Sequence, residues 1–88
     1  MNYRVFWSPN AEIHFDAILE TAPDPPSIAA AARAIDVRLS TDPNDFGESR
    51  LENVRIAFTH PLGIEIEVLE DVSTIIVYEV WRTDLHRN

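Results

Sequence analysis

Two kinds of charged side chain stand at spacings that could support chemistry. Glu65 and Glu67 alternate along one predicted strand, which places their carboxylates on the same face, roughly 6.5–7 Å apart. That separation would suit general acid–base work across a bond that is being broken. The solvent-facing side of an antiparallel strand normally shows the same alternation, and we favour this second interpretation.

The arginines form the other candidate group. Arg55 lies in the predicted strand that precedes the two glutamates, and Arg50 lies just before that strand. Arg82, His86 and Arg87 lie at the C-terminal end of the sequence. If that end folds back over the sheet, three or four cations converge there. Such a cluster could bind phosphate or stabilise the negative charge of a transition state. The alternative is an ordinary solvated surface.

Other kinds of chemistry find little support in the composition. The chain has no cysteine and only two glycines, which excludes a thiolate centre and a glycine-rich phosphate loop. Its histidines, His14, His60 and His86, do not stand at the spacing of a helical zinc site. We therefore expect neither a metal nor a cofactor. Fifteen acidic residues against seven arginines give a net charge of −8, which disfavours binding to a phosphate backbone.

The glutamates and Arg55 belong to a predicted antiparallel meander of three strands over residues 54–81. If its first turn centres on Pro61, a one-residue slip in register would bury the glutamates. This register sets Arg55 opposite Glu67, as a cross-strand ion pair. It also sets three apolar pairs on the other face: Phe58 with Ile64, Ile56 with Ile66, and Val54 with Val68.

The last strand of the meander is apolar on both faces. Its two alternating sets could each point toward the core: Ile76, Tyr78 and Val80, or Ile75, Val77 and Trp81. Both patterns suit a strand that is buried on both faces. They equally suit a strand that exposes an adhesive patch, which would favour a homo-oligomer or an obligatory partner.

The remaining elements must cover the core face of the meander. Residues 2–7 read as a strand inside the sheet, and Ser8 followed by Pro9 is typical of a helix start. A second helix is expected to start at Ser27 and to end near Thr41, before a polar loop over residues 44–50. The apolar stripes of the two helices are Ala11, Phe15, Ile18, Leu19 and Ala22, and Ile28, Ala31, Ala32, Ile35 and Leu39.

The order of these elements, β-α-α-β-β-β, predicts a fold of the α+β class. We expect one two-layer domain over residues 1–88, in which the N-terminal strand and a helical hairpin pack on the C-terminal meander. The opening residues lack a signal peptide, and no apolar run approaches the ~18 residues of a membrane span. We therefore expect a cytoplasmic protein that makes no contact with a membrane.

The sequence resembles the RelE/ParE superfamily of bacterial type II toxins almost from end to end. The resemblance rests on the opening YRVFWSPNAEIHFDAIL, in which a short strand leads through an S-P-x-A turn into a helix. It continues in a second helix that closes with L-S-T-D-P, a loop with FGESR, and a final segment IIVYEVWR. This resemblance implies a compact RelE/ParE-like domain that is the stable partner of a labile antitoxin.

The superfamily implies two different activities. RelE-like members cut messenger RNA on the ribosome with basic residues of the sheet face and tail, without a metal, because the 2′-hydroxyl of the RNA attacks the phosphate. ParE-like members instead inhibit DNA gyrase and are not nucleases. In either case the antitoxin is expected to wrap an extended or helical segment over the helices and sheet of the toxin.

The resemblance carries over unevenly to single residues. It keeps Arg55 in the penultimate hairpin and Arg82 in the closing segment, while the role of a terminal tyrosine or histidine falls to His86. Ala57 stands at a position that is basic in the superfamily, and Glu65 stands where an arginine is common. A glutamate there opposes the negatively charged phosphorane of RNA cleavage.

We therefore expect the toxin-like component of a type II, plasmid-stabilisation-type toxin–antitoxin system that acts by protein binding, with nuclease chemistry weak or lost. One alternative is an active ribosome-dependent endoribonuclease with Arg55, Arg82 and His86 as catalytic residues. The other is a non-toxic interaction module. The expected partners are a cognate antitoxin and, as target, the ribosome with its mRNA or DNA gyrase. Three residues of the first helix are candidates for antitoxin contact, or else core residues: Phe15, Ile18 and Leu19.

Overall fold

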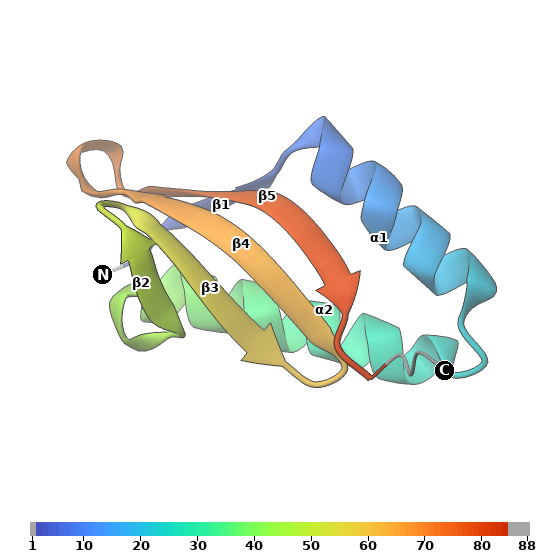
Figure 1. Ribbon diagram of the computed structural model, residues 1–88. Coiled ribbons are helices and arrows are strands. Elements are labelled where there is room, and N and C mark those ends of the chain that lie inside the picture. The colour runs from blue at the N-terminus through green and yellow to red at the C-terminus, as the bar shows by residue number, and fades with distance from the viewer. Residues whose placement is uncertain (1, 85–88) are drawn as a thin grey trace.

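A computed structural model describes residues 2–84 as a five-stranded mixed sheet with two helices. Figure 1 shows α2 crossing one face of the sheet while α1 runs beside β5. This architecture confirms the predicted α+β class. The elements are β1 (Arg4–Trp7), α1 (Pro9–Thr21), α2 (Pro25–Thr41), β2 (Glu48–Leu51), β3 (Val54–Thr59), β4 (Leu62–Leu69) and β5 (Thr74–Arg82), with short 3-10 turns at Pro43–Asp45 and Glu70–Val72.

The strand order, β1-β5-β4-β3-β2, differs from the prediction at both edges. β1 pairs parallel with β5 and forms one edge, so the expectation of an internal strand is wrong. Its two faces still differ, because Val5 and Trp7 pack on the core while Arg4 and Phe6 point away from it. The other edge, β2, overlaps the expected loop over residues 44–50, where no strand was predicted, and pairs antiparallel with β3.

Both helices begin with a proline in the first turn, as its fixed φ and missing donor favour. The predicted cap of α1 is confirmed, since the Ser8 hydroxyl accepts a hydrogen bond from the Ala11 N–H at 3.0 Å. α2 begins at Pro25, before the predicted Ser27, with Asp24 at the N-cap position. The stripe of α2 is the buried one: Ile28, Ala31, Ile35 and Leu39.

The register of the β3–β4 hairpin is one residue away from the prediction. The strands join through two residues, His60 and Pro61, across a cis peptide bond. Arg55 therefore pairs with Ile66 rather than with Glu67, which is a correction to the predicted ion pair. The three predicted apolar pairs are wrong for the same reason. The observed partners are Ile64 for Ala57, Glu65 for Ile56 and Gly63 for Phe58.

A β-bulge decides which side chains of β5 face the helices. Glu65 pairs with Glu79, whereas the next residue of β4, Ile66, pairs with Val77, so that Tyr78 is the extra residue on β5. An extra residue reverses the alternation beyond it. Neither predicted set is therefore correct as a whole, because the buried residues of β5 are Ile75, Val77 and Val80.

Candidate functional site

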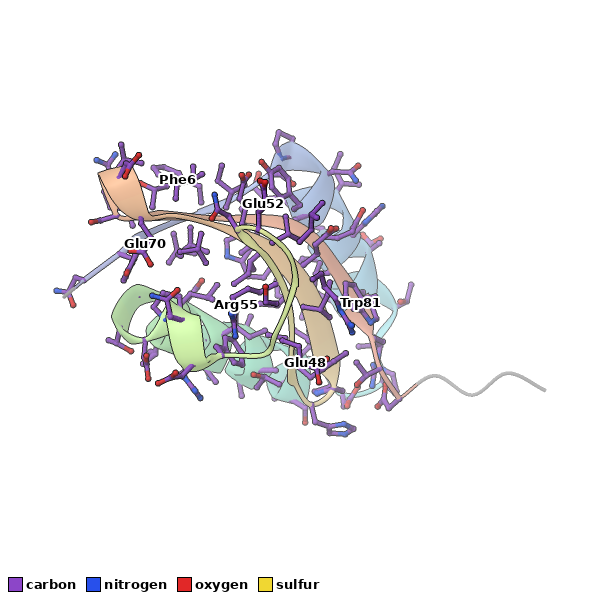
Figure 2. The ribbon with its side chains drawn as sticks, turned by 60° about the vertical axis from the view of Figure 1, so that its left-hand side comes forward. Phe6, Glu48, Glu52, Arg55, Glu70 and Trp81 are labelled. Carbon is purple, nitrogen blue, oxygen red and sulfur yellow. The ribbon has the colours of Figure 1, made fainter. Side chains whose placement is uncertain are left out.

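One face of the sheet is not covered by either helix, and it holds the two glutamates that the sequence singled out. Its side chains come from all five strands and alternate with the residues of the core. We call it the open face and define it by Phe6, Glu48, Val54, Ile56, Phe58, Glu65, Glu67, Ile76, Tyr78 and Trp81. Phe6 and Trp81 lie toward its opposite ends (Figure 2).

An aromatic corner occupies one end of the open face. Trp81 pairs with Gly63 across the β4–β5 ladder, and a Cβ added to this glycine would lie 2.6 Å from the indole Cε2. The indole therefore packs directly on the backbone of β4. Phe58 flanks it edge-to-face, with ring centroids 6.3 Å apart and an interplanar angle of 83°. Sequence reasoning missed this corner, although a glycine inside a strand is a known signal of such a close approach.

The middle of the open face is acidic. Glu65 pairs with Ile56, which pairs in turn with Glu48 on the edge strand. Glu67 accepts a hydrogen bond from the Tyr78 hydroxyl at 2.7 Å. This bond, followed by the partial burial of the ring and the charge of Glu67, raises the pKa of Tyr78 above its usual value. The face thus presents carboxylates where the family resemblance would place cations.

Arg55, the first predicted site residue, lies on the other side of the sheet. Its Nε donates to the Phe46 carbonyl at 3.0 Å and its Nη2 to the Gly47 carbonyl at 2.8 Å. The guanidinium is therefore bonded to the backbone of the segment that joins α2 to β2 (Figure 2). Such charge-assisted bonds hold a loop in place, and they leave Arg55 turned away from the carboxylates of the open face.

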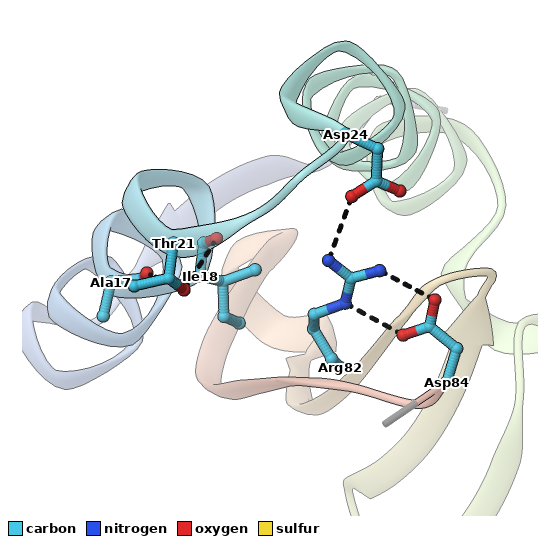
Figure 3. Close-up of polar contacts among 6 residues, drawn as sticks. All are labelled: Ala17, Ile18, Thr21, Asp24, Arg82 and Asp84. Atoms are coloured by element: carbon cyan, nitrogen blue, oxygen red, sulfur yellow. Dashed lines mark hydrogen bonds and ion pairs between the residues drawn. The ribbon is translucent and has the colours of Figure 1, made fainter. Parts of the chain in front are cut away.

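Arg82, the second predicted site residue, is the last residue of β5, and its side chain is only 11% exposed. It donates to both carboxylate oxygens of Asp84, at 2.9 and 2.7 Å, and to Asp24 at 3.1 Å (Figure 3). These bonds raise the pKa of Arg82 and lower that of Asp84. The third predicted residue, His86, lies outside the described residues. Within residues 2–84 the structure does not bring Arg55 and Arg82 together.

A groove of about 450 Å³ separates α1 from the C-terminal half of β5. β1 pairs with β5 only as far as Val77, so beyond that point α1 rather than another strand flanks the edge of β5. Figure 3 shows Ile18 and Arg82 on opposite walls. The lining is mostly apolar and includes Ala17, Ile18, Ala22, Val80, Trp81 and Arg82.

The side chains near the groove are tied to the fold by specific contacts. His14 contacts the Glu79 carboxylate, which also accepts a hydrogen bond from the Asn10 amide at 2.9 Å. The His14 contact is the main cause that lowers the pKa of Glu79. His14 thus joins α1 to β5. Phe15, a predicted antitoxin contact, packs edge-to-face on Trp7, with ring centroids 5.6 Å apart.

Two further features bear on the kind of site. Among residues 2–84, no three side chains of the metal-binding types lie close enough together to hold a metal ion. In the same part of the chain, no helix has both the length and the apolar character that are needed to cross a bilayer.

Solved structures of toxins share this fold. A chain of the toxin–antitoxin complex RelBE2 from Mycobacterium tuberculosis matches with a TM-score of 0.75 and 20% identity, covering 93% of this chain and 99% of that one. A chain of the chromosomal ParDE system from P. aeruginosa gives 0.70 and 17% identity, over 93% of this chain and 97% of that one. A mutant of the E. coli toxin RelE in the free state matches with a TM-score of 0.71 and 9% identity, covering 96% of this chain and 86% of that one.

No family model and no curated protein matches the sequence. The structural likeness, at identities of 20% or less, concerns the fold. At that level it confirms the RelE/ParE-like fold that the sequence predicted.

Proposed function

We propose that this chain is the toxin-like component of a type II toxin–antitoxin system and that it acts by binding proteins, with nuclease chemistry weak or lost. The observation that carries the proposal is the shared fold over more than nine-tenths of the chain with chains of the RelBE2 and ParDE systems. Both of those systems pair a toxin with an antitoxin, so an antitoxin is the partner that we propose here as well.

The groove between α1 and β5 is the place we propose for the antitoxin. It is mostly apolar, and among residues 2–84 its β5 wall is a strand edge that no other strand covers beyond Val77. An extended segment could add to such an edge through main-chain hydrogen bonds, or an amphipathic helix could lay its apolar face there. All three predicted contact residues pack against the core, and Ile18 also lines this groove.

Three observations support protein binding over RNA cleavage. The guanidinium of Arg55 is bonded to two carbonyls behind the sheet, and that of Arg82 is paired with two aspartates. The open face carries Glu65 in the middle of the sheet, and a carboxylate there raises the free energy of an approaching phosphate. A cleavage site built on Arg55, Arg82 and His86 would therefore need both arginines to leave their present partners.

Co-expression with any small reading frame that is found next to this gene tests the proposal. We expect the encoded protein to co-purify with the wild-type chain. Ala17→Glu should abolish this capture, because it places a carboxylate in the apolar groove. Ile13→Glu is the matched control, since Ile13 lies on the same helix, is 64% exposed and does not line the groove. Equal capture by both variants would remove the groove from the proposal.

Induced expression without the neighbouring protein tests the activity. Growth arrest with intact transcripts is the expected result, and it would direct the search to DNA gyrase or another protein target. Transcript cleavage that Arg55→Ala abolishes, in a variant that still unfolds cooperatively, would instead establish the endoribonuclease. Harmless expression together with the absence of any captured partner would leave the non-toxic interaction module.

A further inference from the structure

We infer that the open face binds a basic segment of a partner protein, in which arginine or lysine side chains alternate with apolar ones. This inference deepens the proposed function, because it states the chemistry of the partner that the function requires. The surface concerned is the uncovered face of the sheet, which adjoins the groove in which we place the antitoxin and shares Trp81 with it.

The open face exposes large apolar side chains. Phe58 is 57% exposed and Phe6 is 50% exposed, and both lie on the open face. Between them stand Ile56, Val54 and Ile76, which are half-buried. Glu65 and Glu67 of β4 divide these apolar side chains into two groups. Exposed apolar groups of this kind on a small domain mark an interaction site, and the aromatic corner at Trp81 supplies the rigid anchor that such sites commonly have.

The carboxylates of the open face stand at regular spacings, and two of them, Glu65 and Glu67, lack cationic partners within residues 2–84. Glu65 and Glu67 stand two residues apart on one strand, about 6.5–7 Å, and Glu48 stands two strands away from Glu65, about 9–10 Å. In the described part of the chain no cation pairs with Glu65 or Glu67, and Arg50 approaches Glu48 only to 3.6 Å with both side chains largely exposed. The occupant of this face must therefore bring the cations.

The arrangement also selects among occupants. Nucleic acid is repelled by the carboxylates and by the net charge of −8. A second copy of the chain, in a two-fold symmetric contact, would set the same glutamates against each other. A segment with alternating basic and apolar residues satisfies both features, because its cations reach the carboxylates while a guanidinium can also stack on the aromatic corner.

Fluorescence anisotropy with a labelled octapeptide of alternating arginine and valine tests the inference. We expect the wild-type chain to bind this peptide, with an affinity that falls as salt is added. Glu65→Gln with Glu67→Gln should weaken binding by about tenfold or more, as expected when charged contacts are lost at an interface. Asp16→Asn with Glu20→Gln is the matched control, since it removes the same charge from α1, and it should change binding less than about twofold.

Several outcomes would overturn the inference. Equal weakening by the two double variants would mean that the peptide senses only the net charge. Tighter binding of an oligouridylate of eight nucleotides would assign the face to RNA. Dimerisation that Phe58→Ser abolishes, measured by sedimentation, would assign it to a second copy. Capture of the antitoxin through the groove without any binding of the arginine peptide would refute the inference while the proposed function stands.

Discussion

The two faces of the sheet are built from the same strands and differ in what covers them. Along β4, Ile64 and Ile66 point toward the helices and are fully buried, whereas the alternate residues, Glu65 and Glu67, point to the open face. On β3 the alternation turns Arg55 to the opposite side, toward the segment that joins α2 to β2, and leaves Phe58 exposed on the open face. A strand can thus supply the core with one set of residues and the open face with the other, and Val54, Ile56 and Phe58 of β3 belong to the open face.

The largest contrast between the faces is expected in stability. Ile66→Ala should lower the free energy of unfolding by about 2–5 kcal/mol, because it leaves a cavity at a fully buried site. Phe58→Ala on the open face should cost at most about 1.5 kcal/mol, chiefly from the lost ring contact with Trp81. Urea denaturation of both variants measures the difference. Similar losses would show that the open face is packed like a core.

A substitution at Gly63 tests whether the Trp81 indole packs directly on the backbone of β4 at the open face. Gly63→Ala should destabilise the fold by about 1–3 kcal/mol, because the new Cβ would force the Trp81 indole off the strand. The change should also alter the tryptophan emission. Trp81→Leu in the same background is the control, since removing the indole should relieve most of the cost. An unchanged emission spectrum would contradict the packing of Trp81 on Gly63.

A tyrosine–glutamate pair lies at the border of the covered face, as another does on the open face. Tyr3 donates to Glu70 at 2.7 Å and thereby lowers the pKa of Glu70 below its usual value of 4.5. A carboxyl group whose pKa is lowered by folding stabilises the folded state at any pH above its usual pKa. This stabilisation is lost as the pH falls through the pKa that the group has in the folded state. Tyr3→Phe should therefore flatten the loss of stability below about pH 4.5.

The control for this pair is a double-mutant cycle. In a Glu70→Gln background, Tyr3→Phe should have no pH-dependent effect, because no carboxylate remains to titrate. Denaturation midpoints measured between neutral and acidic pH provide the comparison. If Tyr3→Phe leaves the dependence of the denaturation midpoint on pH unchanged, the Tyr3 hydroxyl does not stabilise the ionised carboxyl of Glu70.

The smallest effect is expected at the centre of the open face. Glu65→Gln should change the free energy of unfolding by no more than about 0.5 kcal/mol, because the side chain makes no ion pair within residues 2–84. It would lower the net negative charge, so any change should favour the folded state. A clear destabilisation would show that Glu65 belongs to the fold rather than to a binding surface.

Much of the fold could be predicted, whereas the candidate site could be predicted only in part. The helical stripes and the start at Ser8 follow local rules, and the structure confirms them. The carboxylates of the open face were also recognisable, because an alternating strand has to show its polar residues to solvent. Arg55 could not be placed, since its position depends on a register that a two-residue loop sets. Gly63 inside a strand signals a close approach at the aromatic corner, but the sequence does not mark the position of the β-bulge that turns Trp81 to the open face.

By itself the sequence determined the class of fold, the acidic charge and the residues that alternate on each strand, because composition and periodicity are local properties. Only the tertiary structure decided which set faced the helices. A single residue gained or lost at a turn or a bulge moves every following side chain to the opposite face. Because of the observed register, Arg55 bonds the loop before β2 instead of facing a phosphate site. Phe58, Trp81 and the glutamates lie on the open face, where we propose that a partner binds.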